Sequence, residues 1–235
     1  MNTLKMTNHK PAWTPGRMAF LLPPAVEHYM LARSSSYSPQ GDALFADTIA
    51  LGDPAVMMLA REQYALFRFL AAHLGWRRVL DIGTFTGLSA QAFAEGMASA
   101  SGRVVTIDRD RAWLDIARRH WTAAGVADRI EVVTGEALPT LRGLSDAPDL
   151  LFDFIFIDAD KALVRDYVDE ALRLLAPGGL IGVDNALWHG WVMDENHRDA
   201  DTDGMRTFND RMAQDSRIET VMLPIADGLT LIRRR

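Results

Sequence analysis

From residue 78 onward, short runs of apolar residues alternate with longer stretches whose apolar residues recur at helical spacing. The apolar runs cover residues 79–82, 104–108, 130–134, 152–158 and 180–184, and the helical stretches between them cover 87–98, 111–124 and 164–175. Continuous apolar strands that alternate with helices are typical of a parallel sheet with both faces covered. Because crossovers between parallel strands are right-handed, the pattern predicts a doubly wound α/β sheet.

The two ends of the chain follow different patterns. Residues 220–223 and 229–232 are predicted to form two strands joined across Asp227-Gly228, a dipeptide typical of hairpins. Before residue 75 the pattern predicts helices at 24–32, 41–51 and 55–74, the last one preceded by the helix-start signal Asp53-Pro54. We therefore predict a single domain over residues 1–235. It comprises an N-terminal helical segment, 1–74, and an α/β core, 75–235, with a mostly parallel seven-stranded sheet and a C-terminal antiparallel hairpin.

Composition excludes several classes of function. The chain has 235 residues, a formal net charge of −6 and no cysteine, which excludes disulfides and thiolate metal sites. An acidic chain without a long Lys/Arg run is a poor candidate for nucleic-acid binding. No stretch reaches the roughly 20 apolar residues that a membrane span needs, and residues 1–17 lack the apolar core of a signal peptide. We expect a cytoplasmic protein without nucleic-acid or membrane partners.

The residues that follow the first two strands suggest a nucleoside-containing ligand, because ligands of open parallel sheets bind beyond the carboxyl ends of the strands. Gly83 and Gly87 let the backbone turn tightly after the first strand. The third glycine of the dinucleotide fingerprint is missing, and Asp81 suits a cationic amino-acid group better than a pyrophosphate. Asp108 ends the second strand, where a carboxylate can accept hydrogen bonds from ribose hydroxyls. A turn without ligand and a helix N-cap are the structural alternatives.

The residues that follow the fourth and fifth strands suit a metal ion. Asp158 opens the sequence Asp-Ala-Asp-Lys, and Asp184 and Asn185 end the fifth strand. Each could be an N-cap or a turn former, but three oxygen ligands at neighbouring strand ends suit a hard divalent cation, Mg²⁺ first and Mn²⁺ or Ca²⁺ next. Lys161 stands at the start of a predicted helix, the unfavourable end of the helix dipole for a cation, so a purely structural role does not explain it.

These motifs resemble those of the cation-dependent O-methyltransferases of the caffeoyl-coenzyme A and catechol type. The matching segments are residues 81–89, 154–161, 175–190 and 223–231, and the resemblance covers roughly residue 55 to the end. It implies S-adenosylmethionine as the methyl donor and a divalent cation as a second cofactor. The implied reaction transfers the methyl group to one hydroxyl of a catechol-like small molecule, and the implied assembly is a homodimer.

The resemblance also implies roles for individual residues. Asp158, Asp184 and Asn185 would hold the metal, Lys161 would be the general base beside Asp158, and Trp188 would form a wall of the acceptor pocket. The positions that would contact S-adenosylmethionine are Asp81, Gly83, Thr84, Ser89, Asp108, Ala137 and Asp160. The family usually has Glu where this chain has Asp81, and residues up to about 51 match it weakly.

Some features allow two interpretations. We expect His189 to be a solvated loop residue, against a substrate contact, and the acidic run 194–203 to be a solvated loop, against a second metal site. Met57 and Met58 are expected in the core, against a contact with the cofactor. The alternative functions are an oxidoreductase with a nucleotide cofactor and a methyltransferase that acts on a non-catechol acceptor.

Overall fold

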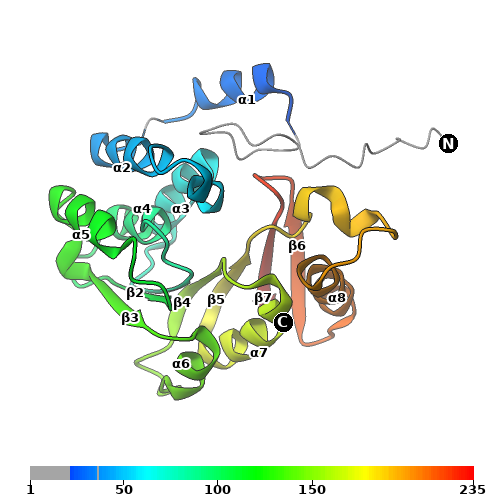
Figure 1. The fold of residues 1–235 in the computed structure, drawn as a ribbon. Coiled ribbons are helices and arrows are strands. Elements are labelled where there is room, and N and C mark those ends of the chain that lie inside the picture. The colour runs from blue at the N-terminus through cyan, green and yellow to red at the C-terminus, as the bar shows by residue number, and fades with distance from the viewer. Residues whose placement is uncertain (1–21, 36) are drawn as a thin grey trace.

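The structure is a computed structural model that describes residues 22–35 and 37–235 (Figure 1). Within these residues, seven strands form one sheet in the order β3-β2-β1-β4-β5-β7-β6. The strands are β1 Arg78–Ile82, β2 Arg103–Asp108, β3 Ile130–Thr134, β4 Phe152–Ile157, β5 Leu175–Val183, β6 Ile218–Leu223 and β7 Leu229–Arg234. β1 to β5 pair in parallel, and β7 pairs antiparallel with both β5 and β6. The predicted sheet and its closing hairpin are confirmed.

Helices cover both faces of the sheet (Figure 1). One hydrophobic cluster joins the sheet to α2 Pro39–Ile49, α3 Arg61–Leu74, α4 Leu88–Gly96 and α5 Leu114–Ala123. The other joins it to α6 Ala137–Gly143, α7 Val164–Leu174 and α8 Ala200–Gln214. In β1, Val79 belongs to the first cluster and Leu80 to the second, so this central strand is apolar on both sides. Among the described helices, which begin with α1 Pro24–Leu31, none has the length and apolarity to cross a membrane.

The expected helix over residues 55–74 is wrong in its first part. A 3-10 helix, η1 Asp53–Met57, is followed by extended backbone at Met58 (ψ 148°), and α3 begins only at Arg61. Met58, Leu59 and Ala60 are all buried, and three consecutive residues cannot all face the core from one side of a helix. The side chain of Gln63 accepts a hydrogen bond from the Ala60 N–H at 3.1 Å and so caps the start of α3.

The acidic run 194–203 is a largely exposed loop, as expected, only up to Asp199, because residues 200–203 form the start of a helix. Asp199 accepts a hydrogen bond from the Thr202 N–H at 2.8 Å and caps α8, which begins at Ala200. From the second turn of α8, Arg206 donates hydrogen bonds to the preceding backbone. Its acceptors are the carbonyl groups of Trp191, Val192, Asp194 and His197. The helix thereby fixes the end of the 3-10 helix η4 Trp188–Met193 and the loop that follows it.

Candidate active site

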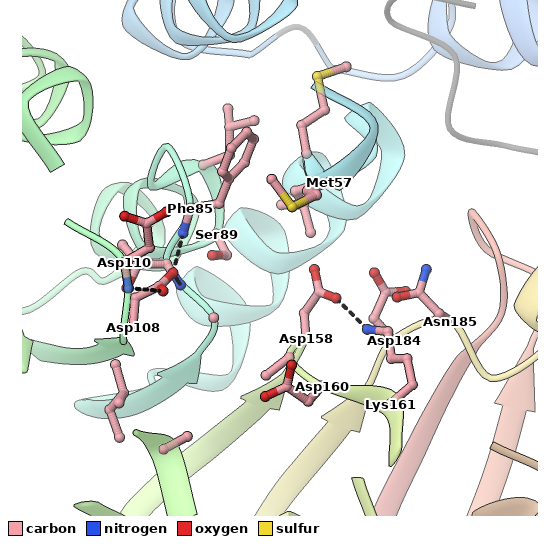
Figure 2. Close-up of a pocket in the computed structure, with 18 of the residues that line it drawn as sticks. Met57, Phe85, Ser89, Asp108, Asp110, Asp158, Asp160, Lys161, Asp184 and Asn185 are labelled. Atoms are coloured by element: carbon pink, nitrogen blue, oxygen red, sulfur yellow. Dashed lines mark hydrogen bonds and ion pairs between the residues drawn. The ribbon is translucent and has the colours of Figure 1, made fainter. Parts of the chain in front are cut away.

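A cavity of about 480 Å³ lies at the carboxyl ends of the parallel strands, where the strand order reverses between β1 and β4. Every predicted site residue except Asp81 lines this cavity. Figure 2 shows two groups of polar side chains along it. Near the glycine turn lie Ser89, Asp108 and Asp110; the other group comprises Asp158, Lys161, Asp184 and Asn185.

The glycine turn after β1 is fixed by the ends of its two neighbouring strands. Gly83 has a φ of 107°, and a Cβ atom there would lie 2.0 Å from the carbonyl oxygen of Asp158, so no larger residue fits. Asp108 at the end of β2 accepts hydrogen bonds from the N–H groups of Thr84 at 3.0 Å and Phe85 at 2.9 Å. Its other oxygen accepts a hydrogen bond from the Asp110 N–H at 2.9 Å. Because a carboxylate has about four lone-pair positions, Asp108 keeps acceptor capacity for one ligand hydroxyl.

Asp81 lies behind the cavity wall, in contrast to the direct ligand contact that the resemblance implies. It is 0% exposed, and its Oδ2 accepts hydrogen bonds from Ser89 Oγ and Thr106 Oγ1, both at 2.9 Å. Burial raises the pKa of Asp81 to about 7. Ser89 itself lines the cavity, so Asp81 is placed to orient Ser89. An Asp side chain is one methylene shorter than the family's usual Glu, which accords with this recessed position.

The second group of side chains brings two carboxyl groups and one amine together in the cavity. Lys161 Nζ lies 2.7 Å from Asp158 Oδ1. Asp184, only 5% exposed, accepts a 2.7 Å hydrogen bond at Oδ1 from Gln63 Nε2. Burial and the nearby charge of Asp158 raise the pKa of Asp184 well above its ordinary range. Gln63 could not be identified from the sequence, because nothing in its local pattern distinguishes it from other polar residues of α3.

Asp227 and His189 extend this polar group toward the C-terminal hairpin. Asp227 is 1% exposed and accepts a hydrogen bond from the backbone N–H of His189 at 2.7 Å. Burial raises the pKa of Asp227 to about 6, against the opposing effects of this hydrogen bond and of Lys161. The His189 side chain is 10% exposed and lines the cavity, so the expectation of a solvated histidine is wrong. Asp227, which we expected only as a turn residue, also lines the cavity.

Backbone strain is concentrated at the cavity. Among the described residues, five that are not glycine have positive φ angles, and all five line the cavity. They are Phe85, Asn185, Trp188, His189 and Ala226. Such conformations cost of order 1–3 kcal/mol each and persist where the surroundings fix them, often at functional sites. The strain therefore supports a functional assignment of this cavity.

Aromatic and sulfur-containing side chains form the remaining walls. Trp188 lines the cavity, and its ring packs edge-on to Trp191 with centroids 6.4 Å apart. Trp191 in turn stacks on His197 at 4.2 Å. Met58 is 2% exposed and Met57 is 52% exposed, and both line the cavity, so the expectation that both belong only to the core is wrong.

The donor set of the second group fits a divalent cation. No three His, Cys, Asp or Glu side chains are grouped as a metal site in residues 22–35 and 37–235, so the candidate set depends on the amide oxygen of Asn185 beside the carboxylates of Asp158 and Asp184. Oxygen donors alone suit Mg²⁺, Mn²⁺ or Ca²⁺. The carboxyl groups of Asp158 and Asp184 face the same cavity, and the pKa of Asp184 is raised because burial and the neighbouring Asp158 disfavour its charged form. A divalent cation would stabilise the ionised form of both carboxyl groups.

The sheet order with its antiparallel C-terminal hairpin, together with a cavity at the switch point, defines a class I methyltransferase fold. Residues 34–235 match the model of a protein family described as O-methyltransferase. The chain belongs to this O-methyltransferase family. Membership favours a methyltransferase over the alternative of a nucleotide-dependent oxidoreductase.

Individual relatives agree with this assignment. The chain is 38% identical over 181 residues to probable caffeoyl-CoA O-methyltransferase 1 of Dictyostelium discoideum, a match that covers 76% of this chain and 78% of the relative. It is 36% identical over 225 residues to catechol O-methyltransferase domain-containing protein 1 of Mus musculus, covering 94% and 85%. The crystal structure of an O-methyltransferase from Bacillus cereus in complex with SAH (S-adenosylhomocysteine) superposes with a TM-score of 0.80, at 32% identity and with coverages of 90% and 97%.

Proposed function

We propose that this protein transfers the methyl group of S-adenosylmethionine to one hydroxyl of a catechol-type small molecule, with a divalent cation as cofactor. Candidate acceptors are caffeoyl-coenzyme A-like esters, flavonoids and other vicinal diphenols. One observation carries the proposal: Asp158, Asp184, Asn185 and Lys161 line the same cavity as the glycine turn after β1. The complex of the Bacillus cereus relative with SAH supports the donor, and the names of the eukaryotic relatives support the acceptor class.

The donor would occupy the half of the cavity beside the glycine turn. Gly83 and Thr84 offer backbone at close range there, Ser89 offers a hydroxyl, and Asp108 retains acceptor capacity for a ribose hydroxyl. Ala137 at the start of α6 and Asp160 complete this half. The Asp160 carboxylate is itself oriented by Arg109, whose guanidinium nitrogens lie 3.2 and 3.3 Å from its oxygens.

The acceptor would occupy the other half. A divalent cation held by Asp158, Asp184 and Asn185 would lower the pKa of a coordinated hydroxyl and fix its position. Lys161, in its neutral amine form, would accept the proton of the acceptor hydroxyl as the oxygen–methyl bond forms and the sulfur–methyl bond breaks. Alignment of the two reactants supplies much of the rate enhancement. Trp188, which lines the cavity, would form one wall of the acceptor pocket.

Assembly and location belong to the same proposal. A homodimer is supported by the edge strand β6, which exposes the apolar side chains of Val221 and Met222 at 54% and 44%, because a bare apolar edge strand favours association. Light scattering of the purified protein measures this directly. We also propose that the protein works in the cytoplasm, as composition predicts.

The proposal is tested with a panel of catechols and the matching monophenols, incubated with S-adenosylmethionine in Mg²⁺ or in EDTA. We expect mass spectrometry to find singly methylated catechols only when Mg²⁺ is present, and no methylated monophenols. Equal activity in EDTA would contradict the metal-dependent mechanism. Methylation of monophenols at the same rate as catechols would instead favour the alternative of a non-catechol acceptor.

A further inference from the structure

Gln63 connects the N-terminal helices to the polar centre of the cavity. It lies in the first turn of α3, its side chain is 0% exposed, and it lines the cavity. Its Nε2 donates a hydrogen bond to Asp184 Oδ1 at 2.7 Å, and its Oε1 accepts one from the Ala60 N–H at 3.1 Å. The reversed amide would set an oxygen against a carboxylate and an N–H against an N–H, so these two contacts define one orientation.

We propose that Gln63 is a positioning residue that fixes the carboxylate of Asp184 for cation binding; this rests on the proposed function. One oxygen of Asp184 is held by the Gln63 amide, which sets the rotation of the carboxylate and therefore the direction of its remaining lone pairs. Asp184 immediately precedes Asn185, whose φ of 60° is strained. Partners that orient metal ligands typically affect metal affinity 10- to 100-fold.

The same side chain links Asp184 to the cavity wall. Ala60, which Gln63 holds through its N–H, directly follows Met58 and Leu59, and both of these line the cavity. The extended backbone of this wall and the orientation of Asp184 are therefore fixed by one amide group. A buried amide that loses one of its two hydrogen bonds is left with an unpaired polar atom, which is costly. Movement of the cavity wall or of the Asp184 carboxylate would break one of these bonds, so each limits the movement of the other.

The test compares Gln63→Met with the matched variant Gln91→Met. Gln91 is also 0% exposed, and its Nε2 also donates to a carboxylate, Glu95 Oε1 at 2.9 Å, but outside the cavity. Isothermal titration with Mn²⁺ should give an affinity about tenfold weaker in Gln63→Met and within about twofold of wild type in Gln91→Met. An equal loss in both variants, or none in either, would overturn the positioning role.

A second measurement needs only the wild-type protein and covers the case in which Gln63→Met does not fold. On titration with Mg²⁺, the side-chain amide resonance of Gln63 should shift in NMR spectra, while that of Gln91 should not. If the Gln63 resonance stays unchanged at saturating Mg²⁺, the positioning role is overturned, but the proposed function is not. If the wild-type protein binds no Mn²⁺ at all, the proposed metal site fails first, and the inference fails with it.

Discussion

Lys161 Nζ lies 2.7 Å from Oδ1 of Asp158, three residues earlier in the chain. The lysine side chain is 10% exposed and the aspartate side chain 23% exposed, so solvent and salt screen this ion pair weakly. Asp158 follows β4 and Lys161 begins the 3-10 helix η3 Lys161–Leu163. The turn between them therefore brings the proposed base and a proposed metal ligand to one point of the cavity (Figure 2).

Replacement of Lys161 by Met should lower kcat about 10²- to 10⁴-fold, because it removes the proposed proton acceptor and keeps a side chain of similar length. Binding of S-adenosylhomocysteine should stay within about twofold, since Lys161 belongs to the acceptor half of the cavity. Steady-state rates and calorimetry measure the two effects. Arg165→Met, an exposed basic residue of α7, is the control. Unchanged turnover in Lys161→Met would remove this residue from the mechanism.

Asp81 should make the stability of the protein depend on pH. Its pKa of about 7 lies above the ordinary value of an aspartate, so the folded state binds this proton more tightly than the unfolded state. Its contribution to the free energy of unfolding is therefore present at low pH and is lost as pH rises through 7. The loss between pH 6 and pH 8 amounts to about 1 kcal/mol.

Urea unfolding of wild type and Asp81→Asn at pH 6 and pH 8 checks this prediction. The free energy of unfolding should fall by about 1 kcal/mol less in the variant over this range, because asparagine does not titrate. Other buried carboxylates titrate in both proteins and cancel in the comparison. The same fall in both proteins would show that Asp81 keeps an ordinary pKa in the folded state.

The sheet could be predicted from the sequence, and the start of α3 could not. Each central strand is apolar on both faces, as Val79 and Leu80 illustrate by joining opposite clusters, and this leaves an uninterrupted apolar run in the sequence. In contrast, apolar spacing over residues 55–74 fits a helix, although Met58 is extended. The pattern identifies apolar residues, but it does not show that the three consecutive residues Met58, Leu59 and Ala60 are all buried.

The candidate site could also be predicted only in part. Residues directly after parallel strands, such as Asp158 and Asp184, could be predicted to converge because those strand ends share one edge of the sheet. Gln63 is 121 residues from Asp184 along the chain, and their contact depends on how α3 packs across the sheet. Asp227 could have been recognised as a site residue from the Pro-Ile-Ala-Asp-Gly sequence. It was assigned only to a turn, because Asp-Gly is typical of hairpin turns. The roles of all these residues stay predictions.

Arg206→Ala should loosen the segment 191–197 and weaken acceptor binding. Arg206 is held by Asp203 at 2.8 Å and donates to four backbone carbonyl groups of that segment, and hydrogen bonds from a charged group contribute roughly 1.5–3 kcal/mol each. We expect faster hydrogen exchange at 191–197 and a KM for the catechol raised about tenfold, with unchanged affinity for S-adenosylhomocysteine. Arg211→Ala, which loses a 3.0 Å contact with Asp169, is the control on the same helix. An unchanged KM despite faster exchange would separate this segment from the acceptor site.

Gly83→Ala should disrupt both halves of the cavity at once. Gly83 and Gly125 both have positive φ angles, 107° and 67°, but a Cβ at Gly83 would lie 2.0 Å from the Asp158 carbonyl oxygen, whereas one at Gly125 would meet nothing within 4 Å. Gly125→Ala should therefore cost only the backbone strain, about 1 kcal/mol. Gly83→Ala must also displace the end of β4, for a total of about 3 kcal/mol or more. Because that displacement moves Asp158, calorimetry should show weaker binding of both S-adenosylhomocysteine and Mn²⁺ in Gly83→Ala alone. Equal urea midpoints for the two variants would mean that the turn after β1 is free to move away from β4.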